Sequence, residues 1–111
     1  MADLYHIALV GDWAAAASSA TGEYAVSTRG RSLADDGFIH CAFAEQVDAI
    51  ATRFYADVDE VVVLRIDPER LPNRVEVVVE DLYDTGERFP HVYGPIPVDA
   101  VVEVRRLRPP R

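Results

Sequence analysis

The chain has 111 residues, half of them apolar, which suits a single domain over residues 1–111 with a sizeable core. It carries 11 Lys+Arg against 19 Asp+Glu, a formal net charge of -8, and this acidic balance argues against a surface that grips nucleic acid. Every one of these cations is an arginine, so no lysine can act as a Schiff base or general base.

Cysteine content and the length of apolar runs bear on the cellular location of the protein. Cys41 is the only cysteine, so an internal disulfide is impossible, as is usual in a reducing compartment. The first residues lack the basic and apolar segments of a signal peptide, and the longest apolar runs have the length of strands rather than of membrane spans. We therefore expect a cytoplasmic protein that does not cross a membrane.

The first third of the chain predicts a strand, a helix and an irregular segment. Leu4–Leu9 has the composition of a strand, and Asp12 is placed to cap an alanine-rich helix over 13–20. The segment 21–36 is expected to be irregular. It gathers arginines, hydroxyl side chains and a glycine at 27–32, which suits either a phosphate-binding loop or an ordinary solvated loop.

The middle of the chain predicts a short strand over 38–41 and then a helix over 44–55. Apolar residues recur there at helical spacing, which predicts a stripe that faces the core and leaves Gln46 and Arg53 more exposed. The members of the stripe are Val47, Ile50, Ala51, Phe54 and Val58.

The rest of the chain is rich in β-branched residues and turn signals. It predicts strands over 60–66, 74–80 and 101–107 and an extended, proline-containing segment over 89–97. The expected fold is α+β: a β-rich split sheet of five or six strands with two main helices, the second of which crosses between strands.

The three histidines are the leading candidates for a functional site. His6, His40 and His91 each sit among apolar or aromatic residues, near the chain start or beside a glycine or proline. Imidazole can exchange a proton near neutral pH, hydrogen-bond a ribose hydroxyl or bind a metal. We expect the three to surround one concavity, although each taken alone could be an ordinary half-buried strand residue.

Two other histidine chemistries have less support. None of the histidines is paired at His-x-His or His-x-x-x-His spacing, so a metal site is an alternative without a ligand motif. Cys41 directly follows His40, and neighbours on a strand point to opposite faces, so His40 cannot activate it as a nucleophile. A buried, structural thiol is expected.

The order of several short motifs resembles the small bacterial DUF952 family. The motifs are Tyr5-His6-Ile7, Ser32 to Cys41 ending in Gly-Phe-Ile-His-Cys, Gln46-Val47, Val63 to Asp67, Glu80, and Phe89 to Pro95 with the pattern Phe-Pro-His-x-Tyr-Gly-Pro. The resemblance covers nearly the whole chain. One departure is Ala42, where the family often has Ser or Thr, and this puts any role of that hydroxyl in doubt.

At a greater distance the family looks like the ADP-ribosyltransferase fold, a split pair of β-rich sheets around an NAD cleft. This resemblance implies that His6 on the first strand holds a ribose hydroxyl, that His91 and Tyr93 form the late motif, and that Glu80 is the nearest counterpart of the catalytic glutamate. His40 stands where that fold usually has a small residue or tyrosine. The catalytic candidates are His6, His40, Glu80 and His91, and the ligand-binding candidates are Tyr5, Ser32, Phe38 and Tyr93.

The chemistry expected of such a site is cleavage of the nicotinamide glycosidic bond. Positive charge develops on the ribose, which a carboxylate such as Glu80 would stabilise, while His6 holds hydroxyls and Tyr93 stacks on a ring. We expect a nucleotide ligand with NAD as substrate, no tightly bound cofactor, and ADP-ribosyl transfer or NAD hydrolysis as the reaction. The alternatives are a non-catalytic small-molecule-binding domain and a histidine-based metal site.

Overall fold

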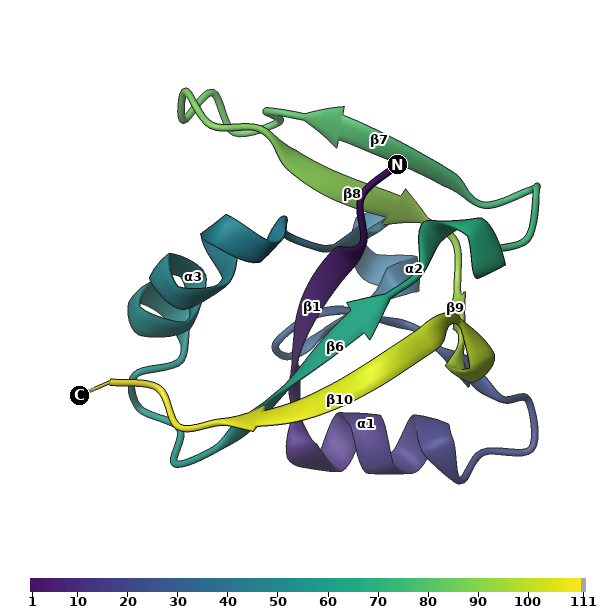
Figure 1. Ribbon diagram of the computed structural model, residues 1–111, viewed down its shortest axis with the longest axis horizontal. Coiled ribbons are helices and arrows are strands. Elements are labelled where there is room, and N and C mark those ends of the chain that lie inside the picture. Colours follow the sequence, from purple (N-terminus) through teal and green to yellow (C-terminus); the bar gives the residue numbers. More distant parts are fainter. Residues whose placement is uncertain (111) are drawn as a thin grey trace.

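Strands from the two ends and the middle of the chain form one sheet. In the computed structural model, which describes residues 1–110, β1 (Leu4–Leu9) and β10 (Val101–Leu107) flank β6 (Val61–Ile66), and both run antiparallel to it (Figure 1). The bounds of β1 and β10 match the predicted strands, and β6 begins one residue later than the predicted strand 60–66. The residues of β6 are buried on both faces except Arg65, which explains its continuous apolar run.

A second sheet carries the late motifs. Within residues 1–110 its order is β5-β8-β7, with β8 (Phe89–Tyr93) between β5 (Ile39–His40) and β7 (Glu76–Glu80), all antiparallel. The β8 and β7 strands lie at the top of Figure 1, above the first sheet. Two short pairs join β2 (Glu23–Tyr24) to β9 (Ile96–Pro97) and β3 (Val26–Thr28) to β4 (Arg31–Ser32). The chain is β-rich as predicted, and its described strands form two three-stranded sheets and two short pairs, with more short strands than expected.

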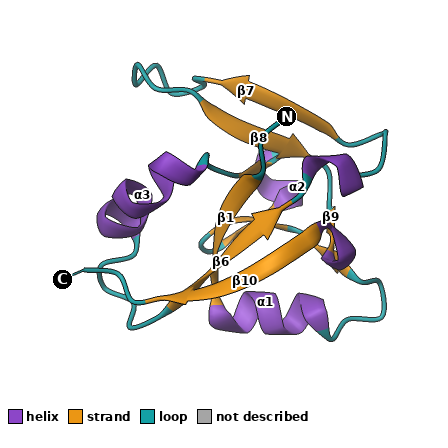
Figure 2. Ribbon diagram, viewed as in Figure 1, coloured by secondary structure: helices purple, strands orange, loops and turns teal. Residues whose placement is uncertain are grey.

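Helices are few and short, as Figure 2 shows. They are α1 (Val10–Ala17), α2 (Leu33–Asp36) and α3 (Val47–Phe54), with 3₁₀ turns at Ala44–Gln46, Pro68–Arg70 and Val98–Ala100. The first begins directly after β1 with no side-chain cap, so the prediction that Asp12 caps a helix over 13–20 is wrong. The second lies in the segment expected to be irregular. There Ser32 and Asp35 form a capping box, and Gly37 ends the helix at a φ of 84°.

The α3 helix corrects one predicted core residue. Val47 and Ala51 are buried as predicted, but the ring of Phe54 is 56% exposed and the next residue, Tyr55, is buried instead. Residues 47, 51 and 55 form one row of a helix, four residues apart, and this row faces the first sheet. Ile50 and Val58 are half-buried and pack against the same cluster, so Phe54 is the one residue of the predicted stripe that turns away from the core.

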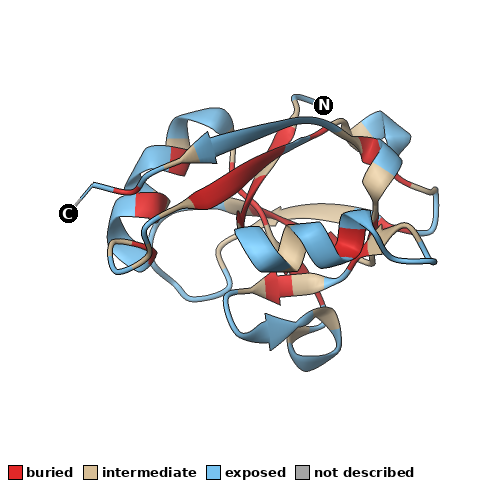
Figure 3. Ribbon diagram, turned by 90° about the horizontal axis from the view of Figure 1, so that it is seen from below, coloured by how far each residue is buried: buried red, intermediate tan, exposed pale blue. Residues whose placement is uncertain are grey.

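The core lies against both faces of β6. One cluster of buried residues includes Leu4, Leu64 and Ile96, and a second includes Ile7, Val63 and Tyr55. Figure 3 shows these buried segments in red beneath pale blue outer elements. No helix within the described residues is long and apolar enough to cross a membrane.

Candidate functional site

His6 connects three strands from a buried position. It is 2% exposed, its Nδ1 lies 2.6 Å from the carbonyl oxygen of His40, and its Nε2 lies 2.8 Å from the hydroxyl of Tyr24. A carbonyl only accepts, so Nδ1 carries the proton and Nε2 accepts from the hydroxyl. Burial lowers the pKa of His6 from 6.5 to about 4, and burial likewise raises the pKa of Tyr24. Both ring nitrogens of His6 are therefore used within the protein.

His40 lies nearer the surface, on β5. Its Nδ1 is 3.0 Å from the hydroxyl of Ser27, which itself donates to the carbonyl of Phe38 and so must accept from His40. Its Nε2 is 3.2 Å from the hydroxyl of Tyr83, and the two rings are nearly parallel at 6.2 Å. Burial is the main cause that lowers the pKa of His40, followed by the nearby His91. Oδ2 of Asp36 lies 3.9 Å from Nδ1 of His40, and its negative charge partly offsets the lowering of the His40 pKa.

His91 forms a pair with Glu80. Its Nδ1 is 2.8 Å from Oε2 of Glu80, which also accepts from the hydroxyl of Tyr93. These bonds, that from Tyr93 first, lower the pKa of Glu80, and the bond to Glu80 raises the pKa of Tyr93 to about 12. A carboxylate only accepts, so Nδ1 of His91 carries a proton in this pair, and Nε2 is the nitrogen that would hold the lone pair in the neutral form of the ring.

The second ring nitrogen of His91 is the available one. Its side chain is only 3% exposed, and Nε2 has no hydrogen-bond partner within residues 1–110. No buried nitrogen or oxygen of the described side chains lacks a partner, so Nε2 must reach the solvent. A carboxylate on one nitrogen and an open position on the other is an arrangement typical of general bases.

Strand pairing explains why these groups meet. His40 and His91 are directly opposite on β5 and β8, with ring centroids 5.6 Å apart. On the other side of β8, His91 is opposite Val78, and Glu80 is two residues further along the same face of β7. The structure thus brings His40, Glu80 and His91 together, with His6 connected through the backbone of His40.

Five rings form one connected aromatic cluster around the Glu80–His91 pair, in which Phe38 and His91 are buried. Phe38 stacks on His91 at 4.3 Å and also contacts the rings of His40 and Tyr93, at 4.7 and 5.4 Å, while Tyr83 stacks on His40. Tyr83 and Tyr93 are exposed. We call these five residues the aromatic shelf.

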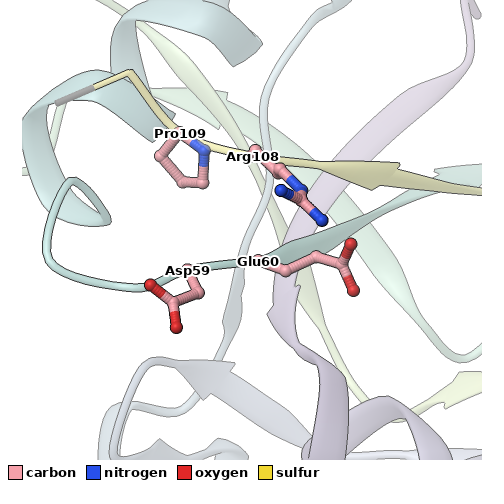
Figure 4. Close-up of a pocket in the computed structure, with 4 residues that line it drawn as sticks. All are labelled: Asp59, Glu60, Arg108 and Pro109. Atoms are coloured by element: carbon pink, nitrogen blue, oxygen red, sulfur yellow. The ribbon is translucent and has the colours of Figure 1, made fainter.

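Two hollows described in the structure lie elsewhere. The larger, about 550 Å³, is lined by Asp59, Glu60, Arg108 and Pro109, between the start of β6 and the segment after β10 (Figure 4). The smaller borders α3 and Phe89. Neither is lined by a histidine, so these hollows are not the concavity expected around the three histidines: His40 and His91 meet at the aromatic shelf, whereas the ring of His6 contacts Tyr24.

The remaining predicted residues have local roles. Tyr5 forms a backbone bridge with Ala42 and packs against the second core cluster, on the opposite face of β1 from His6. The hydroxyl of Ser32 caps α2. Cys41 is buried, and burial raises the pKa of its thiol, which fits the expected structural role.

Sequence reasoning missed three partners of the histidines: Tyr24, Ser27 and Tyr83. None lies in a predicted strand or helix, and hydroxyl residues are common in turns and loops. Ser27 belongs to the hydroxyl-rich stretch 27–32, but that stretch suggested a phosphate-binding loop and not a partner of His40. Among the described residues, no three His, Cys, Asp or Glu side chains are grouped so that they could hold a metal ion.

The elements define a small, β-rich, mixed α/β domain with few helices. The chain belongs to the DUF952 family: the family model, described as "Protein of unknown function (DUF952)", matches residues 7–104. The chain is similar to the crystal structure of protein CC0527 from Caulobacter crescentus, with a TM-score of 0.74 and 30% identity over 95% of this chain and 85% of that chain. A double mutant of CC0527 gives the same TM-score and coverage at 28% identity. None of the curated proteins matches this chain.

Proposed function

We propose that the aromatic shelf binds the planar ring of a nucleotide such as NAD, and that the Glu80–His91 pair acts on this ligand by proton transfer. The observation that carries the proposal is the open Nε2 of His91, held by Glu80 beside the exposed rings of Tyr83 and Tyr93. Exposed aromatic faces stack on nucleotide bases and on nicotinamide.

The protonation states suit a general base next to developing positive charge. Glu80 is ionised at neutral pH because hydrogen bonds from Tyr93 and His91 lower its pKa, and Tyr93 stays protonated. In the neutral form of His91, with Nδ1 bonded to Glu80, the lone pair is on Nε2. The pair therefore offers a proton acceptor and a fixed negative charge within one hydrogen bond of each other.

The reaction that these groups suit is transfer of an ADP-ribosyl group. The bond between ribose C1′ and the nicotinamide nitrogen breaks, and nicotinamide leaves with the electron pair. Water or another hydroxyl attacks C1′ and gives its proton to Nε2 of His91, while Glu80 stabilises the positive charge on the ribose. The remote resemblance to the ADP-ribosyltransferase fold supports this choice of reaction only as an analogy.

His6 has a different role in this proposal from the one that the sequence suggests. Both of its nitrogens are bonded within the protein, so it positions β5 and His40 rather than holding a ribose hydroxyl.

Binding and turnover are tested separately. Calorimetry with NAD, ADP-ribose and nicotinamide measures binding, and release of nicotinamide from NAD measures turnover. Replacing the ring of Tyr83 by alanine should weaken nucleotide binding about five- to a hundredfold, as expected from the loss of one stacked ring. No interaction with any of the three ligands at millimolar concentration would rule the nucleotide proposal out.

Two variants test the catalytic pair. His91→Asn keeps a donor near the position of Nδ1 and removes Nε2, and Glu80→Gln removes the charge. Each should lower turnover about 10²- to 10⁴-fold, and Glu80→Gln, which leaves every ring of the aromatic shelf in place, should leave binding within a few-fold. Glu76→Gln, an exposed glutamate on the same strand, is the matched control. Ligand binding without turnover in the unmodified protein would instead support a non-catalytic binding domain.

A further inference from the structure

One edge of the first sheet is open. The order β1-β6-β10 leaves β10 with a neighbour on one side only within residues 1–110, and the strand is seven residues long. In Figure 3 it follows the outer rim in pale blue. Its residues from Val102 to Arg106 are exposed, and the apolar side chains of Val102 and Val104 are 43% and 44% exposed. Unpaired backbone groups along such an edge are a template for another strand.

Some charged side chains of β10 form no close ion pair within the described part of the chain. Arg105 makes no hydrogen bond or ion pair within the described part of the chain, and Glu103 has only a 4.0 Å contact with Arg65. By contrast, Arg106 is held by Glu60 at 2.6 Å. Glu103 and Arg105 therefore present one negative and one positive side chain that could pair with another chain. They lie two residues apart on the same face of the strand.

We propose that two copies of this chain form a symmetric dimer by antiparallel pairing of their β10 edges, centred on Val104. This inference is independent of the proposed function.

Symmetry selects that centre. Opposite residues of an antiparallel pair point to the same face, so a two-fold axis perpendicular to the sheet sets one residue opposite itself. With Val104 at the axis, Glu103 of each copy is opposite Arg105 of the other, which forms two ion pairs. Centring on Glu103 or on Arg105 instead sets like charges against each other, which destabilises a sheet.

The irregular part of β10 leaves this pairing intact. The register with β6 shifts between Val101 and Glu103, which makes Val102 an extra residue. Glu103, Val104 and Arg105 lie beyond the shift, where β10 is paired regularly with β6.

The open edge of the other sheet is a useful contrast. Within residues 1–110 the β7 strand has a neighbour on one side only, but it carries a glutamate at each end. Pairing β7 with its own copy about its middle residue, Val78, sets Glu76 against Glu80 of the other chain. Charge repulsion therefore disfavours pairing of two β7 edges, whereas charge complementarity favours pairing of two β10 edges.

The first test is the oligomeric state. Sedimentation equilibrium should show a monomer–dimer system that approaches a closed dimer as concentration rises. A protein that stays monomeric at millimolar concentration, or forms a growing series of larger species, would overturn the proposal. Reversing one charge, by Arg105→Glu or Glu103→Arg, should raise the dimer dissociation constant at least about tenfold, because two attractive pairs become repulsive ones.

Exchanging the charges provides a control for folding. The double variant Glu103→Arg with Arg105→Glu recreates the two pairs and should return the dissociation constant to within a few-fold of the original. Arg74→Glu, at an exposed arginine outside β10, should leave it unchanged. A double variant that dimerises no better than the single ones would contradict the proposed register.

Cross-linking tests the centre directly. In the proposed dimer the two copies of Val104 have Cβ atoms about 5 Å apart, whereas the two copies of Val102 are separated by about 13 Å along the strands. Under oxidation Val104→Cys should form a disulfide dimer and the equally exposed Val102→Cys should not. The native Cys41 is buried and does not compete. Equal cross-linking of both variants, or cross-linking of Val102→Cys alone, would refute the assigned centre.

Discussion

Acidification should destabilise this protein in part through a single buried histidine, His6. In the folded chain its Nδ1 donates to the carbonyl of His40 and its Nε2 accepts from the hydroxyl of Tyr24. Protonation of Nε2 would break the second bond and place a charge where no solvent reaches. Burial accordingly lowers the pKa of His6 to about 4, while the unfolded chain has the ordinary value of 6.5.

The direction of the pH effect follows from these two values. The unfolded chain takes up a proton more readily, so the contribution of His6 to stability is fully present above pH 6.5 and is lost as the pH falls toward 4. The full difference between the two pKa values corresponds to about 3 kcal/mol, since one unit is about 1.4 kcal/mol. About 2 kcal/mol of this is lost between pH 7.5 and pH 5.

The perturbation is His6→Gln, which cannot titrate in this range. At pH 7.5 it should lower the free energy of unfolding by about 1–3 kcal/mol, because one buried partner is left without its hydrogen bond. Between pH 7.5 and pH 5 the variant should then lose about 2 kcal/mol less than the original protein. The pKa of His40 is also lowered by burial, but His40 is present in both proteins and cancels in the difference.

Urea unfolding followed by the fluorescence of Trp13, whose ring lies 6.3 Å from that of Tyr24, measures both proteins at each pH. Tyr24→Phe is the control: it removes the hydroxyl but leaves His6 buried, so the pH dependence should persist. Equal pH dependence in the original protein and in His6→Gln would refute the reasoning.

Three further predictions concern stability. Phe54→Ala should change the free energy of unfolding by less than about 0.5 kcal/mol because the ring is exposed, whereas Tyr55→Ala should cost about 3–5 kcal/mol, as measured by urea unfolding. Ser32→Ala should cost about 1 kcal/mol by loss of the cap of α2, and Ser32→Thr should restore most of it. In Gly94→Ala the new Cβ would lie 2.8 Å from Cγ2 of Val75, so it should cost about 1–3 kcal/mol; a thermal melt of the double variant with Val75→Ala should recover part of the loss, and no recovery would show that the clash is not the cause.

Local patterns in the sequence were sufficient to predict the main strands. The bounds of β1 and β10 match those predicted, and the β-branched run 60–66 contains β6. These segments are defined by composition and by the turn residues that flank them, which act over a few positions only. The order of the short motifs was likewise sufficient for the family.

Helix details depended on contacts that no local pattern contains. A stripe of apolar residues predicts the buried face of α3 only to within about one residue. In the structure, packing against the first sheet buries Tyr55 and leaves Phe54 exposed. Similarly, α1 begins directly at the end of β1, since the sheet fixes that end and no capping side chain is needed.

The sequence picked out the three histidines and Glu80, but tertiary structure decided what each one does. His40 and His91 are 51 positions apart and face each other only because β5 pairs with β8 in one register; a shift by one residue would point them to opposite sides of the sheet. The pairing of β7 with β8 sets Glu80 beside Nδ1 of His91 and leaves Nε2 open, whereas His6, equally prominent in the sequence, is enclosed by Tyr24 and the backbone of β5. Residue type and neighbours determine what a histidine can do, but its free nitrogens and its solvation are set by strands that are distant in the chain.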